Sequence, residues 1–173
     1  MEKGLVHLYT GDGKGKTTAA VGLAVRAAGR KKKVVFCQFL KNNQSGEIPV
    51  LAEIPEIEVV QDYPVSGFTF SMTQEQREKT AWEQQEKWKK AVQLSKDADL
   101  LVLDEVMAAV NGKFLPIGWV TDFLQNKPET LEVVLTGRNP PPEIASLCDY
   151  YSEIAAKAHP FQKGIPAREG IEF

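Results

Sequence analysis

The chain has 173 residues, of which 43% are hydrophobic and 25% are charged. This length suits one domain and gives enough apolar surface for a core without disulfide staples, so a disordered or fibrous chain is excluded. The net charge of -2 argues against broad electrostatic binding to nucleic acid. Two distant cysteines, without a CxxC pair, exclude a disulfide scaffold and a cysteine-rich zinc site.

The sequence shows no signal for export or for insertion into a membrane. No signal-peptide pattern precedes the first apolar run, and no apolar run is long enough to span a bilayer. We therefore expect a cytoplasmic protein without a membrane partner.

The first half of the chain alternates predicted strands and helices. Leu5 to Tyr9 is a short apolar run that leads into a glycine-rich turn. Lys16 to about Arg30 is rich in alanine and predicts a helix, which Gly29 is placed to end. Val34 to Leu40 is an almost continuous apolar run, as expected for a strand that is covered on both faces. Ile57 to Gln61 predicts a further strand.

A long helix and a buried strand follow. Thr73 opens the helix, and Gln76 completes a capping-box pattern with it. Leu100 to Leu103 predicts a buried strand that ends at Asp104-Glu105. Pro116 stands at the first turn of another helix, which carries an apolar stripe.

The last third continues the alternation. Glu132 to Leu135 predicts a strand that ends at Thr136-Gly137-Arg138, Pro140 to Pro142 start a short helix, and Tyr150 to Ile154 predicts the last strand. Strands that alternate with helices predict an α/β fold with a mostly parallel β-sheet flanked by helices. We expect residues 1–173 to form a single domain.

The segment from Thr10 to Thr18 predicts a phosphate-binding loop (P-loop), because it lies between a predicted strand and a predicted helix. Its glycines let backbone N–H groups turn inward, and the helix N-terminus adds the positive end of a dipole. We expect Lys16 to reach phosphate oxygens and the Thr17 hydroxyl to ligate Mg²⁺. The loop departs from the usual spacing, since Thr10 stands where a glycine is expected. The candidate ATP-binding residues here are Gly11, Asp12, Gly13, Lys14, Gly15, Lys16, Thr17 and Thr18.

The acidic pair Asp104-Glu105 resembles the end of a Walker B strand, which places carboxylates beside a metal ion. Glu105 is either a metal-associated group or, as in many ATPases, the base that activates water. From these residues alone, a transferase and a P-loop ATPase or nucleotide kinase both remain open.

The unusual loop and several later segments resemble the cob(I)alamin adenosyltransferases of the CobA/BtuR/CobO type. The matching segments follow in order over nearly the whole chain. They are Gln38-Phe39-Leu40-Lys41, Gly67-Phe68-Thr69-Phe70, Leu103-Asp104-Glu105, Thr136-Gly137-Arg138-Asn139, Lys157-Ala158-His159-Pro160-Phe161 and Gly170-Ile171-Glu172-Phe173.

The resemblance implies a RecA-like P-loop domain that transfers the 5′-deoxyadenosyl group of ATP to the cobalt of cob(I)alamin or a related corrinoid, with triphosphate as the leaving group. It implies catalytic roles for Lys16 and Glu105, with Mg²⁺ held by Thr17 and Glu105. It also implies that Arg138 contacts the nucleotide, although a surface ion pair is an equal alternative for this residue.

The resemblance further implies that Phe68 and Phe70 form the corrinoid-binding aromatic wedge, which displaces the lower ligand of cobalt. The alternative is that both rings pack a loop onto the core. A reductase that delivers electrons to cobalt and a homodimer are the other partners implied. A non-catalytic protein that binds ATP or a corrinoid is a further alternative, but Lys16, Thr17 and the acidic pair argue against it.

Overall fold

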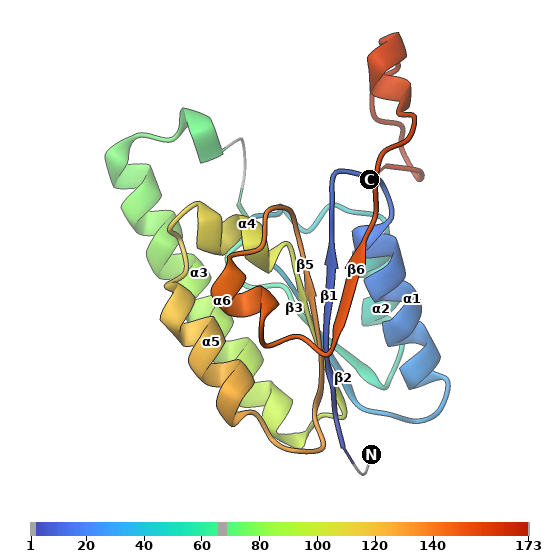
Figure 1. The fold of residues 1–173 in the computed structure, drawn as a ribbon, viewed down its shortest axis with the longest axis vertical. Coiled ribbons are helices and arrows are strands. Elements are labelled where there is room, and N and C mark those ends of the chain that lie inside the picture. Colours follow the sequence, from blue (N-terminus) through green and yellow to red (C-terminus); the bar gives the residue numbers. More distant parts are fainter. Residues whose placement is uncertain (1–2, 66–68, 173) are drawn as a thin grey trace.

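The strands form one six-stranded parallel sheet in the order β3-β2-β4-β5-β1-β6 (Figure 1). The computed structural model describes residues 3–65 and 69–172. The strands are β1 (Val6–Thr10), β2 (Val34–Gln38), β3 (Ile57–Val60), β4 (Leu100–Asp104), β5 (Glu132–Thr136) and β6 (Tyr150–Glu153). The helices are α1 (Lys16–Ala28), α2 (Glu47–Ala52), α3 (Gln74–Leu94), α4 (Val106–Asn111), α5 (Ile117–Asn126) and α6 (Pro142–Ala145). The 3₁₀ turns are η1 (Thr69–Ser71), η2 (Ser95–Asp97) and η3 (Pro160–Lys163).

The predicted α/β fold with a parallel sheet is confirmed. Several predicted ends of strands and helices differ by one or two residues, and two differences have a clear physical reason. β2 ends at Gln38, before the predicted Leu40, because the backbone of Leu40 is left-handed with φ 51° and leaves the extended conformation. Helices α2 and α4 were not predicted, since each has six residues and is too short to show a helical period.

Both faces of the sheet are covered by helices. Successive strand residues point to opposite faces, so β2 contributes Phe36 to the core under α1 and α2 and Cys37 to the core under α3, α4 and α5. All five residues of β2 and of β4 are buried, which explains their continuous apolar sequences. Within the described residues, no helix is both long enough and apolar enough to cross a membrane.

The long helix α3 begins at the predicted cap. The Thr73 hydroxyl accepts a hydrogen bond from the Gln76 amide at 3.2 Å, and the Gln76 side chain accepts one from the Thr73 amide at 2.8 Å. The inner face of α3 also buries polar groups, and the Lys87 ammonium donates to the Gln38 carbonyl at 3.1 Å. Helix α3 is therefore tied to the end of β2 by a hydrogen bond as well as by apolar packing.

The carboxyl ends of all six strands meet at one edge of the sheet, because the strands are parallel. The loop after β1, Asp104-Glu105 after β4 and Thr136 to Arg138 after β5 all lie at this edge. The C-terminal tail rises beyond the same edge on one side, and the start of α3 rises on the other (Figure 1).

Replacing Gly11 by alanine should lower the free energy of unfolding by more than about 1 kcal/mol. Gly11 has φ 102°, and an added Cβ would lie 2.3 Å from the Ile154 carbonyl oxygen. The matched control is Gly22→Ala in α1, where an added Cβ meets nothing within 4 Å. There alanine should raise the free energy by about 0.5–1 kcal/mol. Urea denaturation measures both variants, and effects of the same sign would contradict the geometry.

Candidate functional site

The phosphate loop is held against the end of β6 and folds around the Lys16 side chain. The Gly13 amide donates to the Ile154 carbonyl at 2.7 Å. The Lys16 ammonium donates to the carbonyl oxygens of Gly11 and Gly13, both at 2.8 Å. Burial, and then the charge of Arg138, lower the pKa of Lys16 below its usual value. The loop thus encloses a largely buried cation at the N-terminus of α1.

Asp104 is the hydrogen-bond centre of the site and is fully buried. Its Oδ1 accepts from the Thr17 hydroxyl at 2.9 Å and from the Thr136 hydroxyl at 2.7 Å. Its Oδ2 accepts from the Gln38 side-chain amide at 3.0 Å. One carboxyl group therefore joins β4 to α1, β5 and β2.

Glu105 follows on a left-handed turn with φ 57° at the start of α4. Its amide donates to the Thr136 hydroxyl at 2.9 Å, and its side chain lines the same pocket as Lys16. Burial, and then the nearby Asp104, raise the pKa of Glu105 above its ordinary value. Thr17 and Glu105, the two groups expected to hold Mg²⁺, both line this pocket, and their role at a metal ion stays a prediction.

Arg138 reaches the loop from the end of β5. Its guanidinium donates to the Asp12 carbonyl at 3.4 Å. The backbone turns sharply before it at Gly137, where φ is 137° and an added Cβ would lie 2.6 Å from Cβ of Met107. The Asn111 side chain donates to the Arg138 carbonyl at 3.1 Å and so fixes the turn. The bond to Asp12 places the Arg138 side chain at the pocket that Lys16 and Glu105 line, and its contact with a nucleotide stays a prediction.

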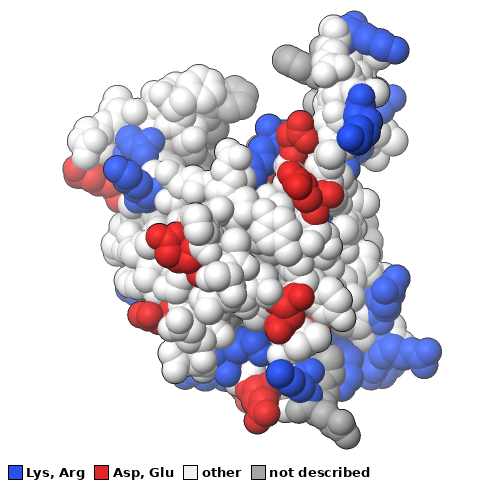
Figure 2. Space-filling model, viewed as in Figure 1, with Lys and Arg blue, Asp and Glu red and all other residues white. Residues whose placement is uncertain are grey.

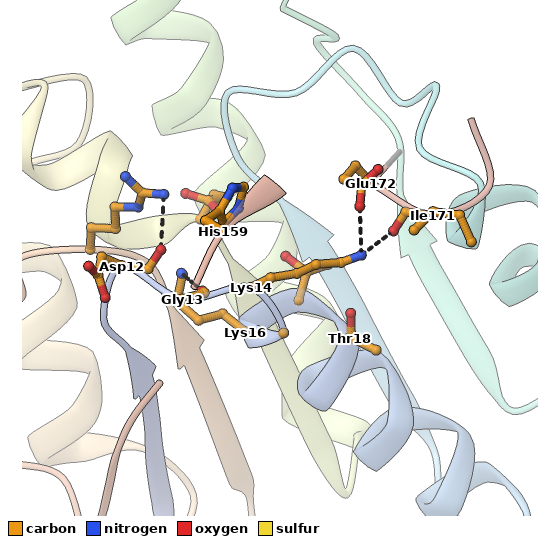
Figure 3. A pocket seen from close by; sticks show the side chains of 12 residues that line it. Asp12, Gly13, Lys14, Lys16, Thr18, His159, Ile171 and Glu172 are labelled. Atoms are coloured by element: carbon orange, nitrogen blue, oxygen red, sulfur yellow. Dashed lines mark hydrogen bonds and ion pairs between the residues drawn. The ribbon is translucent and has the colours of Figure 1, made fainter. Parts of the chain in front are cut away.

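These groups surround one pocket above the N-terminus of α1 (Figure 3). Its lining joins the loop, two strand ends and the C-terminal tail. The residues are Asp12, Gly13, Lys14, Gly15, Lys16, Thr17, Thr18, Glu105, Arg138, His159, Ile171 and Glu172. A neighbouring hollow shares Thr17, Thr18, Ile171 and Glu172 with this pocket and continues to Lys41 and Glu47.

The tail residues at the pocket were not among the candidates from the sequence. The Lys14 ammonium donates to the Ile171 carbonyl at 2.6 Å and to Oε1 of Glu172 at 3.3 Å (Figure 3). Asp12 Oδ1 accepts from the Ala156 amide at 2.9 Å, and this bond is the main cause of a lowered pKa of Asp12. The sequence signal for Ile171 and Glu172 is the segment Gly170 to Phe173, which resembles the family but does not by itself indicate a role.

Of the two candidate corrinoid-binding rings, the structure describes Phe70. Phe68 lies outside the described residues. Phe70 lies in η1 and is 83% exposed, so it does not pack this segment onto the core as the alternative from the sequence required. The η1 turn lies beyond the edge of the sheet that carries the phosphate loop, on the side away from the C-terminal tail (Figure 1).

The oxygen groups of Thr17, Asp104 and Glu105 are chemically suited to Mg²⁺, which prefers hard oxygen ligands. Among residues 3–65 and 69–172, no three His, Cys, Asp or Glu side chains gather as a ligand set. A sparse protein contribution fits Mg²⁺, since this ion takes most of its ligands from phosphates and water.

Comparison with known proteins gives the family. Residues 2–173 match the family described as ATP:corrinoid adenosyltransferase BtuR/CobO/CobP. The chain belongs to this family. It is 35% identical to the corrinoid adenosyltransferase of Pseudomonas aeruginosa over 99% of this chain and 85% of that protein. It is 34% identical to the one of Escherichia coli K12 and 33% to that of Salmonella typhimurium, each over 99% of this chain and 87% of the relative.

Glu105→Gln should stabilise the protein at neutral pH when Mg²⁺ and nucleotide are absent. A carboxyl group with a raised pKa in the fold favours its neutral form, so the wild-type protein loses stability as the pH rises through that pKa. Glutamine cannot ionise. The gain in free energy of unfolding from the substitution should therefore grow as the pH rises above the ordinary pKa of a glutamate, about 4.3. Urea denaturation over a series of pH values measures it, and a gain that is constant with pH would contradict the raised pKa.

Proposed function

We propose that this chain transfers the 5′-deoxyadenosyl group of ATP to the cobalt of cob(I)alamin or a related corrinoid and releases triphosphate. Membership of the ATP:corrinoid adenosyltransferase family supports this reaction. The observation that carries it to this chain is the convergence of Lys16, Thr17 and Arg138 with a buried Asp104 at one pocket.

The reaction breaks the bond between the ribose 5′ carbon and the triphosphate oxygen, and it forms a carbon–cobalt bond. Negative charge builds on the departing triphosphate, so preorganised cations and N–H donors stabilise the transition state. Lys14, Lys16 and Arg138 line the pocket together with the amides of the loop. Because cob(I) is already a strong nucleophile, the protein contributes position and electrostatics rather than a base.

Thr17, with Asp104 behind its hydroxyl and Glu105 beside it, would hold Mg²⁺ at the phosphates. The ion would supply positive charge that neutralises the phosphate oxygens. Asp104 would orient the Thr17 hydroxyl, because its carboxylate accepts a hydrogen bond from that hydroxyl at 2.9 Å. A lone pair of the Thr17 oxygen is then left for the ion. Glu105 on this account is associated with the metal and is not the base of a hydrolase.

The exposed Phe70 supports a corrinoid site near the start of α3, beyond the edge of the sheet where the phosphate loop lies (Figure 1). A largely exposed aromatic ring gains apolar contact when a flat macrocycle covers it. The companion role of Phe68, a reductase that delivers electrons to cobalt, a homodimer and a cytoplasmic location are further parts of this proposal.

Mixing the protein with Mg-ATP and chemically reduced cob(I)alamin under anaerobic conditions should give the absorbance spectrum of adenosylcobalamin. Lys16→Ala should slow the reaction by about 100-fold or more, because it removes a buried cation from the leaving-group site. The control is Lys31→Ala, whose side chain is 83% exposed beyond the C-terminal end of α1; it should retain the wild-type rate. No cobalt–carbon product from the wild-type protein, or a full rate in Lys16→Ala, would refute the assignment.

A further inference from the structure

The C-terminal segment forms a strap that leaves the phosphate loop and returns to it. It begins where the Ala156 amide donates to Asp12 Oδ1 at 2.9 Å. It ends where the Lys14 ammonium donates to the Ile171 carbonyl at 2.6 Å. Between these points the segment rises from the body of the molecule and carries basic side chains (Figures 1 and 2). Both anchors lie in the loop, so the pocket is bounded by the C-terminal segment as well as by the loop after β1.

The Glu172 carboxylate accepts four hydrogen bonds from described residues. Its Oε2 accepts from the backbone amide of Arg168 at 2.8 Å and from Nε of the same residue at 3.1 Å. Its Oε1 accepts from the Arg168 guanidinium at 3.1 Å and from the Lys14 ammonium at 3.3 Å. These bonds, with those from Arg168 first, lower the pKa of Glu172 to about 2, so the carboxylate is charged at any working pH.

The four bonds decide what Glu172 can do. A carboxylate offers about four acceptor positions, and here Arg168 takes three and Lys14 takes one. Glu172 has no acceptor position left for a hydroxyl of the nucleotide. Its effect on a ligand must therefore pass through the cations that it holds.

Lys14 is the cation through which that effect reaches the pocket. Its ammonium group has three N–H donors, and the contacts with Ile171 and Glu172 use two of them. The side chain lines the phosphate pocket and is 47% exposed, so without these contacts its long flexible stem would be free to move in solvent.

We propose that Glu172 is a positioning residue for the triphosphate. Arg168 anchors the Glu172 carboxylate, and the carboxylate holds the Lys14 ammonium at the mouth of the phosphate pocket. This inference rests on the proposed function, because it takes the triphosphate of ATP as the ligand of the pocket. It assigns a role to the C-terminal Gly170-Ile171-Glu172 motif. It also makes the end of the chain part of the nucleotide site.

The direction in which a charge-removing substitution at Glu172 changes the affinity for triphosphate distinguishes this role from direct electrostatic repulsion. A carboxylate that merely lies near the pocket repels a triphosphate, so its removal would tighten binding. If Glu172 holds Lys14 in place, its removal frees a phosphate-binding cation and weakens binding. ATP and inorganic triphosphate should weaken by the same factor, because Lys14 contacts phosphate and not the nucleoside.

Calorimetry on the full-length protein tests this with Mg-ATP and with Mg-tripolyphosphate as ligands. Glu172→Gln should weaken both by about 5- to 10-fold, the usual size for a lost charge-assisted contact. It should raise the KM for ATP and leave the KM for the corrinoid unchanged. The control Glu169→Gln removes the same charge from an exposed position of the same strap and should change either affinity by less than about 2-fold.

A double-mutant cycle with Lys14→Met shows whether Glu172 acts through Lys14. In the Lys14→Met background, Glu172→Gln should have no further effect on either affinity. Tighter or unchanged binding in Glu172→Gln, or an undiminished loss in the Lys14→Met background, would overturn the inference. Failure of the wild-type protein to bind either ligand would instead refute the proposed function, so the two failures are distinguishable.

Discussion

The site depends on the buried carboxyl group of Asp104. A carboxyl group without contact with water is tolerated only when its oxygens are hydrogen-bonded. Here the partners are Thr17, Thr136 and Gln38, which belong to α1, β5 and β2. Each of these elements is therefore held in register with β4 at the edge where the phosphate loop lies, and a shift of any one would leave a buried polar group unpaired.

The phosphate loop beside this carboxyl group also contacts the C-terminal segment of the chain. Gly13 bonds to Ile154 beyond β6, so the phosphate loop takes its shape from a strand that is far away in the sequence. The strap then returns to Lys14. Three cationic side chains, Lys14, Lys16 and Arg138, line the pocket. Such a lining suits a reaction in which the whole triphosphate departs, since charge spreads over all three phosphates.

Much of this fold is predictable because its signals are local. The continuous apolar runs of β2 and β4, the capping box at Thr73 and the glycines of the loop each act within a few residues. The hydrogen bond from Thr17 to Asp104 is not local, because it joins residues that are 87 positions apart. The contact of Lys14 with Ile171 spans 157 positions, and no periodicity or spacing predicts it.

The central claim is that this P-loop protein uses triphosphate as a leaving group, in contrast to enzymes that cleave between the phosphates. Phosphorus-31 nuclear magnetic resonance of the products, after one turnover with cob(I)alamin, distinguishes the two kinds of cleavage. If triphosphate leaves whole, its resonances appear in equal amount to the adenosylated corrinoid. Resonances of ADP and inorganic phosphate in place of triphosphate would show that water attacks the γ-phosphate in this pocket, and they would contradict triphosphate as the leaving group.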